Sequence, residues 1–163
     1  NDQEFIDKVV GVGSTHNIDI QVLGRRENIK FRSYLIQKFV PTIFRYQTRS
    51  AWRFLSLYIS NEIKYYTTQS DGILGDLSEI IRHDNSLITF DYCEHVFRMD
   101  NLKNFELFRH SAIEQGAWLG YFYIFDEDLS FVIMHTTHEN SLDGVFHIFG
   151  EAIDWFQEYE SKS

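Results

Sequence analysis

The sequence predicts a single-domain α+β protein, residues 1–163, with a mostly antiparallel sheet, a central hairpin at about residues 117–136 and helices packed on it. The hairpin segment, AWLGYFYIFDEDLSFVIMHT, has aromatic and β-branched residues on both sides of a short polar break. Both faces of its two strands are apolar, so we expect it to be central in the sheet and covered by helices on at least one face. A chain of 163 residues with 44% apolar and 17% aromatic residues can fill one core.

The first part of the chain predicts two helices and at least one strand. Residues 4–12 fit either a short helix or a first strand, and their valines favour the strand. Alternating apolar and polar residues predict a half-buried strand at 18–22. A helix over 29–40 should end at Pro41, which has no N–H and disfavours the helical conformation at Val40. The other expectations are a turn at 14–17, a loop at 24–28, an extended segment at 42–46 and a long helix at 50–66 capped by Ser50.

The second part predicts further strands and helices around the hairpin. A strand at 87–93 should have one wetter face, which carries Thr89 and Asp91. Residues 145–149 are apolar enough to form a short strand, and residues 151–159 form an amphipathic helix with an apolar inner face. The other expectations are a polar linker at 67–72, a short helix at 74–82, a helix at 104–114 and a polar loop at 137–144.

The net charge of −9 is distributed unevenly along the chain. Residues 1–64 carry ten Lys/Arg against six Asp/Glu, a net of +4, whereas residues 65–163 carry five against eighteen, a net of −13. This acidic excess disfavours general nucleic-acid binding and favours a basic protein partner. The single cysteine, Cys93, cannot form an internal disulfide, which is typical of a reduced cytoplasmic protein.

The sequence contains no sign of a membrane segment. No apolar run reaches the roughly 18 residues that a membrane-spanning helix needs. No signal peptide is visible, although the chain begins at Asn1 and not at Met, which is consistent with removal of a leader or of a few residues.

Two acidic segments supply the candidate binding residues. Asp126, Glu127 and Asp128 form the hairpin tip. Helical spacing places Glu151, Asp154, Glu158 and Glu160 on the outer face of the last helix, and the first three of these are the other candidate binding residues. If both segments belong to one patch, their carboxylates suit a cationic partner. Otherwise they are ordinary solvated charges.

The histidines supply the best candidate for a metal site. His135, His138 and Glu139 offer donors suited to zinc, and a third nitrogen ligand would come from His147 or His110. The order of the residues is not H-E-x-x-H, and they lie at a strand end, so they match no known protease geometry. We therefore expect surface histidines, no metal and no cofactor.

Two shorter patterns favour structural roles. Asp91, Cys93 and His95 fall on one face of a strand, but strand residues two apart do not reach each other without a bulge, so a buried thiol is favoured over a Cys–His nucleophile pair. The segment Gly11-Val12-Gly13-Ser14 lacks the spacing and the lysine of a phosphate-binding loop, and we interpret it as a turn.

The basic stretch from Arg25 to Arg53 is interleaved with aromatic residues. Such a combination can bind single-stranded nucleic acid by charge and stacking. The same residues at helical spacing are more typical of a core helix with a solvated face, and the acidic half would repel nucleic acid. Direct nucleic-acid binding is therefore a minor alternative. The aromatic residues are Phe31, Tyr34, Phe44, Tyr46 and Trp52.

The acidic second half, the hairpin AWLGYFYIFDEDLSFVIMH and the closing helix EAIDWFQEY resemble the immunity proteins of bacterial contact-dependent growth inhibition systems. These are small, acidic, aromatic-rich cytoplasmic α+β proteins that bind and neutralise one toxin domain. The resemblance implies a cognate basic toxin domain, a nuclease in particular, whose active cleft the acidic surface would occlude, and no enzymatic activity. The alternatives are a hydrolase or nuclease that uses the histidines, and a nucleic-acid-binding or regulatory scaffold module.

Overall fold

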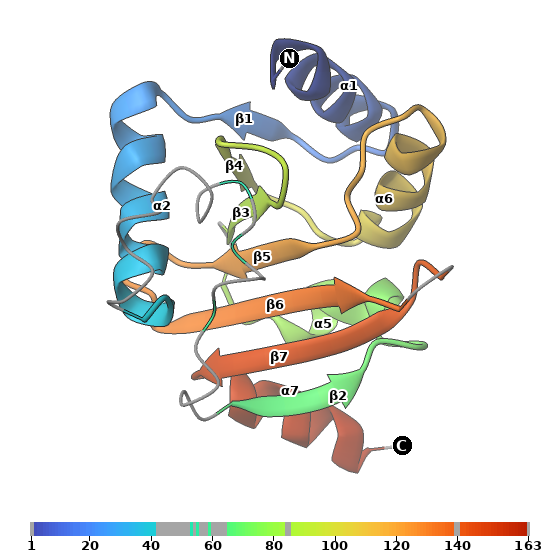
Figure 1. Ribbon diagram of the computed structural model, residues 1–163. Helices are drawn as coiled ribbons and strands as arrows, with labels where there is room; N and C mark the ends of the chain where they lie inside the picture. The colour runs from blue at the N-terminus through green and yellow to red at the C-terminus, as the bar shows by residue number, and fades with distance from the viewer. Residues whose placement is uncertain are drawn as a thin grey trace.

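The computed structural model describes residues 2–41, 53, 55, 59, 65–83, 86–138 and 141–162. These residues form one seven-stranded antiparallel sheet in the order β1-β4-β3-β5-β6-β7-β2 (Figure 1). The strands are β1 (Ile20–Val22), β2 (Tyr66–Gln69), β3 (Ser86–Phe90), β4 (Val96–Met99), β5 (Phe122–Phe125), β6 (Phe131–Thr137) and β7 (Gly144–Gly150). The helices are α1 (Asp2–Thr15), α2 (Arg25–Phe39), the 3-10 helix η2 (Leu74–Asp76), α5 (Leu77–Ile80), α6 (Phe105–Glu114) and α7 (Ala152–Ser161). The α+β class is confirmed.

The predicted hairpin, β5–β6, lies in the middle of the sheet, as expected. Helices cover both of its faces: α2 packs on one, and α1, α5, α6 and α7 pack on the other (Figure 1). Phe122 and Ile124 face the four-helix side, and Tyr123 and Phe125 face the α2 side. The first strand of the hairpin begins at Phe122 and is shorter than the predicted segment.

The N-terminal segment is a helix, so the preference for a strand was wrong. Ile6, Val9, Val12 and Gly13 recur at helical spacing and form the buried side of α1. A Cβ at Gly13 would lie 2.3 Å from the Ile20 side chain, so glycine allows α1 to pack closely on β1. Packing of this stripe outweighs the modest helix cost of valine.

The second helix begins earlier than predicted and ends where predicted. Residues 24–28 are not a loop, because Gly24 is the extended N-cap of a helix that starts at Arg25. Phe39 is the last helical residue, and Val40 before Pro41 is extended (φ −96°, ψ 126°).

Two strands were not predicted, and both depend on partners remote in sequence. Residues 67–72 are not a linker, because Tyr66–Gln69 forms the edge strand β2 against β7. The short strand β4 pairs with β1 and β3. The wetter face predicted for β3 is also wrong, since Thr89 and Asp91 are buried.

Two helix predictions have a different outcome. The short helix predicted at 74–82 is present as η2 followed directly by the single turn α5, and it ends at Ile80, two residues earlier than expected. The segment 42–46 and most of the helix predicted at 50–66, with Ser50, lie outside the described residues. No described helix is long and apolar enough to cross a membrane.

Phe122→Ala should lower the free energy of unfolding by about 3–5 kcal/mol, the usual cost of deleting a buried phenylalanine ring. Phe122 is fully buried, and its ring centroid lies 5.1 Å from that of Phe105 and 4.8 Å from that of His135. Urea denaturation measures the loss. Leu107→Ala, at a position 62% exposed, is the control and should change stability little. Equal losses in the two variants would contradict a core centred on β5.

Candidate acidic interaction surface

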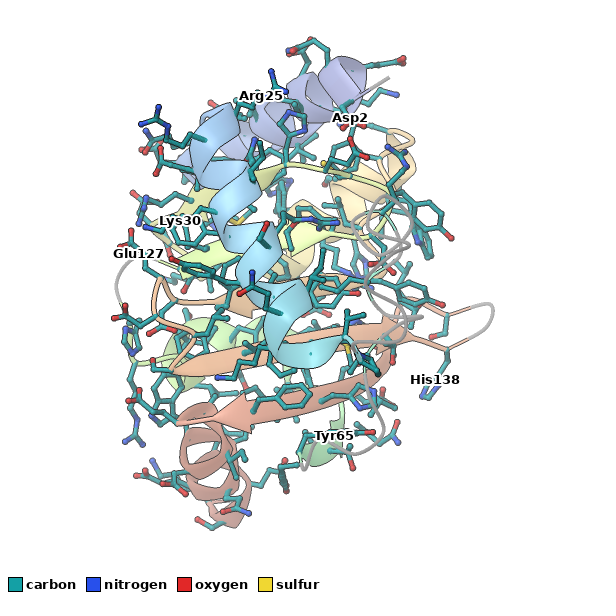
Figure 2. All side chains as sticks on the ribbon, turned by 60° about the vertical axis from the view of Figure 1, so that its left-hand side comes forward. Asp2, Arg25, Lys30, Tyr65, Glu127 and His138 are labelled. Atoms are coloured by element: carbon teal, nitrogen blue, oxygen red, sulfur yellow. The ribbon has the colours of Figure 1, made fainter. Side chains whose placement is uncertain are left out.

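The hairpin tip and the start of α7 lie side by side at one end of the sheet. Phe131 at the start of β6 pairs with Gly150 at the end of β7, and the Glu151 N–H donates to the Ser130 carbonyl at 2.9 Å. Gly150 is left-handed (φ +73°), and a Cβ there would lie 2.1 Å from the Ser130 oxygen, so the close approach requires glycine. The two acidic segments therefore meet here, with Glu127 at the edge of the molecule (Figure 2).

One predicted binding residue, Asp126, holds the hairpin turn together. Its half-buried carboxylate accepts hydrogen bonds from the N–H of Ser130 at 2.7 Å, from the N–H of Phe131 at 3.4 Å and from the Ser130 hydroxyl. Leu129 is left-handed (φ +53°), and its N–H donates to the Asp126 carbonyl. The turn therefore occupies this carboxylate, and we leave Asp126 out of the binding surface.

The five other predicted binding residues are exposed, and we call them the acidic surface: Glu127, Asp128, Glu151, Asp154 and Glu158. Three of them have basic partners: Glu127 with Arg98 at 2.8 Å, Glu151 with His83 at 3.6 Å, and Glu158 with Arg82. Asp128 and Asp154 form no ion pair with any described residue. These two carboxylates are the most available for a partner.

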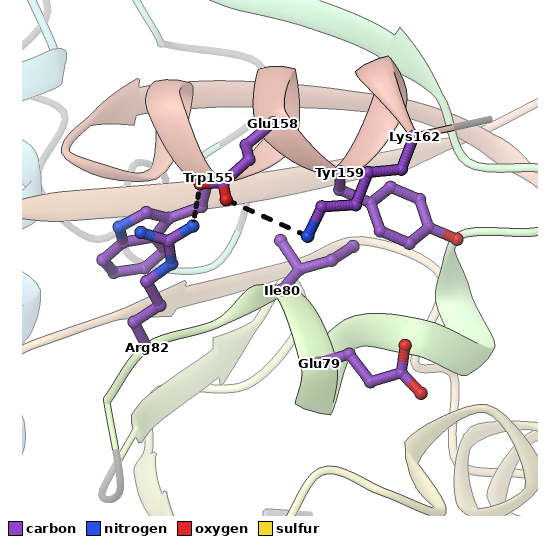
Figure 3. A pocket seen from close by; sticks show the side chains of 7 residues that line it. All are labelled: Glu79, Ile80, Arg82, Trp155, Glu158, Tyr159 and Lys162. Atoms are coloured by element: carbon purple, nitrogen blue, oxygen red, sulfur yellow. Dashed lines mark hydrogen bonds and ion pairs between the residues drawn. The ribbon is translucent and has the colours of Figure 1, made fainter.

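A groove of about 300 Å³ runs between α5 and α7 beside the acidic surface (Figure 3). The Glu158 carboxylate lies between Arg82 and Lys162, and its hydrogen bond to Arg82 keeps the pKa of Glu158 below its ordinary value (Figure 3). At the same helix, the Tyr159 hydroxyl donates to Asp76, which raises the pKa of Tyr159 to about 12. The lining residues are Glu79, Ile80, Arg82, Trp155, Glu158, Tyr159 and Lys162.

Glu160 was predicted to lie on the exposed outer face of α7, and this prediction is wrong. It is half-buried and accepts a hydrogen bond from the Tyr66 hydroxyl on the edge strand β2. This hydrogen bond raises the pKa of Tyr66. Glu160 therefore attaches α7 to the sheet edge, which leaves it outside the acidic surface.

The described basic residues of the stretch 25–53 lie mainly along α2, on the face of the sheet opposite α7, and Lys38 at the end of α2 donates to the Leu129 carbonyl of the hairpin turn at 3.0 Å. Arg25, Arg26, Lys30 and Lys38 are exposed there (Arg25 and Lys30 are labelled in Figure 2). Of the predicted stacking aromatics, Phe31 is buried in the core, Tyr34 is 40% exposed, and Phe44, Tyr46 and Trp52 lie outside the described residues. The described part of the stretch is thus a core helix with a solvated basic side.

The histidines do not converge on one point. His135 is buried on the four-helix side of the sheet. His147 is the cross-strand partner of Met134, so both of these residues face the α2 side. His138 is exposed and contacts Gln69, and His110 is exposed on α6. The ligand set proposed from the sequence therefore does not form within the described residues, and Glu139 lies outside them. The expectation that these are surface histidines is wrong for His135.

Burial lowers the pKa of His135 to about 3, and the nearby Arg109 cation adds to this effect. The ring Nδ1 lies 3.0 Å from the Gly120 carbonyl, and the ring stacks on Phe122. Arg109 is itself fully buried. Its Nε donates a hydrogen bond to the Leu119 carbonyl at 2.9 Å. Burial lowers the pKa of Arg109 to about 10. Nothing in the sequence distinguished this arginine from a surface residue.

The prediction of a buried thiol at Cys93 is confirmed. Burial raises its pKa to about 11, which is the opposite of what a cysteine nucleophile requires. Asp91 turns inward and accepts a hydrogen bond from the Tyr123 hydroxyl at 2.7 Å. The sequence predicted that Asp91 would lie on one face with Cys93 and His95. The carboxylate that lies beside these two residues is instead that of Asp2, at the start of α1.

Asp126→Ala should lower the free energy of unfolding by about 1–3 kcal/mol, because it leaves the Ser130 N–H and its neighbours without their acceptor. Asp128→Ala, two residues away and exposed, is the control and should change it by less than about 0.5 kcal/mol. Chemical denaturation of both variants makes the comparison. Equal effects would show that the Asp126 carboxylate does not stabilise the turn.

Stability should fall on acidification partly because His135 is held neutral. Its folded pKa of about 3 lies below the ordinary histidine pKa of 6.5, so between these pH values the unfolded chain binds one more proton. Stability is therefore fully present above pH 6.5 and falls by up to about 1.4 kcal/mol per pH unit as pH decreases toward 3. Unfolding by urea at pH 7, 5.5 and 4.5 measures this slope.

His135→Phe should reduce that slope, because the variant has no proton to gain at this position. His138→Gln, which changes an exposed histidine, should keep the wild-type slope. Parallel pH profiles for wild type and His135→Phe would refute the neutral, buried histidine.

Comparisons with known proteins give no relative. No protein-family model, no curated protein and no solved structure matches this chain. Evidence for function therefore comes from the acidic surface and from the polar clusters of the molecule itself.

Proposed function

We propose that this protein is an immunity protein, which binds a cognate basic toxin domain, specifically a nuclease, and blocks its active cleft. The observation that carries the proposal is the acidic surface, in which two segments distant in sequence meet through the pairing of Phe131 with Gly150. Asp128 and Asp154 of this surface are exposed and form no ion pair with any described residue. Resemblance to immunity proteins supports the same proposal.

The physical basis is electrostatic complementarity. A nuclease cleft is cationic because it receives phosphates, and carboxylates can take the places of those phosphates. Opposite charge raises the association rate up to about 10⁸–10⁹ M⁻¹s⁻¹ at low salt, and salt lowers this rate by screening. The ion pairs of Glu127 and Glu158 leave the local field weaker than a count of acids suggests.

Affinity also requires an apolar anchor, since exposed charges at the rim of an interface contribute little. A hollow of about 470 Å³ adjoins α7 and β2, and it is lined by Tyr65, Tyr66, Ile153 and Gln157. We propose that an apolar side chain of the toxin fills this hollow while the acidic surface contacts the basic cleft. The hollow would then contribute most of the affinity, and the acidic surface would raise the association rate.

The other functions considered receive less support. A histidine-based hydrolase or nuclease needs imidazoles that share a site, whereas His135 and His147 lie on different faces of the sheet. Nucleic-acid binding would use the basic side of α2. Of the described aromatic residues of α2, Tyr34 is exposed and Phe31 and Phe39 are buried, so few rings are available for stacking on bases. We propose a cytoplasmic location, in keeping with the single unpaired cysteine.

Reversing the two unpaired carboxylates should slow association with the toxin. The partner is the catalytically inactive form of the toxin domain encoded directly upstream of the gene. Asp128→Lys/Asp154→Lys should reduce the association rate roughly tenfold or more at low salt and flatten its salt dependence, because the steering field weakens. Stopped-flow measurements over a salt series give both quantities.

The matched control is Asp19→Lys/Glu114→Lys, which makes the same change in net charge at two exposed acids elsewhere on the molecule. It should retain most of the wild-type rate. Equal slowing in both double variants would mean that net charge acts without a specific surface. If the neighbouring toxin does not bind wild type at any salt concentration, the proposal fails.

A further inference from the structure

A second polar cluster lies where the first turn of α1 meets the β3–β4 turn. Asp2, Cys93 and His95 each offer one metal-ligating atom here, and these atoms lie within 4.8 Å of one another. Asp2 Oδ2 is 3.3 Å from His95 Nδ1, and the His95 N–H donates to Cys93 Sγ at 3.4 Å. No other group of three such donors occurs in the part of the chain that the structure describes.

We propose that Asp2, Cys93 and His95 bind one divalent transition metal ion of the zinc class. Carboxylate, thiolate and imidazole are the donors that zinc takes in proteins, commonly in tetrahedral geometry. Metal–ligand bonds of about 2.0–2.3 Å place tetrahedral donor atoms roughly 3.3–3.8 Å apart, so the present cluster needs only a small contraction. Glu94 or a water molecule would complete the shell.

His95 Nδ1 is the atom of the cluster that a bound cation would satisfy; buried nitrogens of Arg32, Arg109, His135 and His147 also have no hydrogen bond, but those residues lie outside the cluster. His95 Nδ1 is buried and has no hydrogen bond, because its contact with Asp2 Oδ2 lacks hydrogen-bond geometry. A buried ring nitrogen without a hydrogen bond is unfavourable by itself. An ion between the imidazole nitrogen and Asp2 Oδ2 would satisfy the nitrogen and would add to the long hydrogen bond, 3.5 Å, that Oδ2 accepts from the Glu94 N–H.

The surrounding charges are compatible with an added divalent ion. Asp2, Asp91 and Glu94 oppose Arg32 and Arg53, so the cluster with a neutral thiol carries one negative charge. Binding releases the Cys93 proton, since thiolate is the ligand, and the cluster then becomes neutral. Arg53 contacts the other carboxylate oxygen, Asp2 Oδ1, at 3.8 Å, whereas Oδ2 accepts only the 3.5 Å hydrogen bond from the Glu94 N–H and keeps a lone pair for the ion.

The position of the cluster determines how an ion can reach it and which elements a bound ion would connect. A surface hollow of about 650 Å³ includes Gln3, Glu94 and His95 in its lining, so an ion can approach from solvent. A bound ion would connect the start of α1 to the β3–β4 turn. This proposal replaces the expectation of a metal-free chain, which considered the residues around His135, and it does not depend on the toxin.

The test uses untagged protein with Co²⁺ as a spectroscopic probe and Zn²⁺ as a competitor. Wild type should bind one equivalent of Co²⁺ with a near-ultraviolet sulfur-to-cobalt absorption band, and Zn²⁺ should abolish the band and raise the melting temperature. Cys93→Ser should lose the band. His95→Gln and Asp2→Asn should each weaken Co²⁺ binding at least tenfold.

His138→Gln, at an exposed histidine outside the cluster, is the matched control and should bind Co²⁺ as wild type does. Because Cys93 is buried and its variant could be unstable, the two partly exposed ligands Asp2 and His95 provide the decisive comparison. Absence of the sulfur-to-cobalt band in wild type, or unchanged affinity in both His95→Gln and Asp2→Asn, would overturn the proposal.

Discussion

Both faces of the β5–β6 hairpin are apolar, and the three layers of the molecule follow from this constraint. Phe122 and Ile124 can leave water only if helices cover their side of the sheet, and Tyr123 and Phe125 require the same on the other side. The four-helix layer and α2 meet these two requirements. The same coverage explains why every residue of the neighbouring strand β3 is buried, although the strand includes Ser86 and Thr89.

A sheet buried on both faces makes its ends the places where polar groups must be satisfied. Asp126 accepts the free N–H groups of its own turn, and the buried Arg109 donates to the carbonyl of Leu119. Asp91 does the same for the Tyr123 hydroxyl. The buried His95 Nδ1 has no hydrogen bond, which is also true of buried nitrogens of Arg32, Arg109, His135 and His147, but of these residues only His95 lies in the cluster of three metal-ligating donors.

Local signals predicted the hairpin, the end of α2 and the helix α7, because apolar periodicity and Pro41 act within a few residues. The strands β2 and β4 have four residues each and no marked periodicity, so only pairing with distant strands defines them. The valines of α1 favoured a strand prediction, although its apolar residues recur at helical spacing. The meeting of the two acidic segments and the position of Asp2 beside Cys93 depend on register and packing, which a single sequence does not encode locally.

The distribution of charge matters more for recognition than the net value of −9. The basic side of α2 lies on the face of the sheet opposite α7, and Lys38 brings it up to the hairpin turn, so the acidic surface is most attractive to a cation at its α7 side. The proposed ion site is at the far end of β3 from the hairpin tip, since Leu87 pairs with Phe125 whereas Phe90 leads into the β3–β4 turn. A metal ion could therefore stabilise the fold without occupying the surface that the toxin would contact.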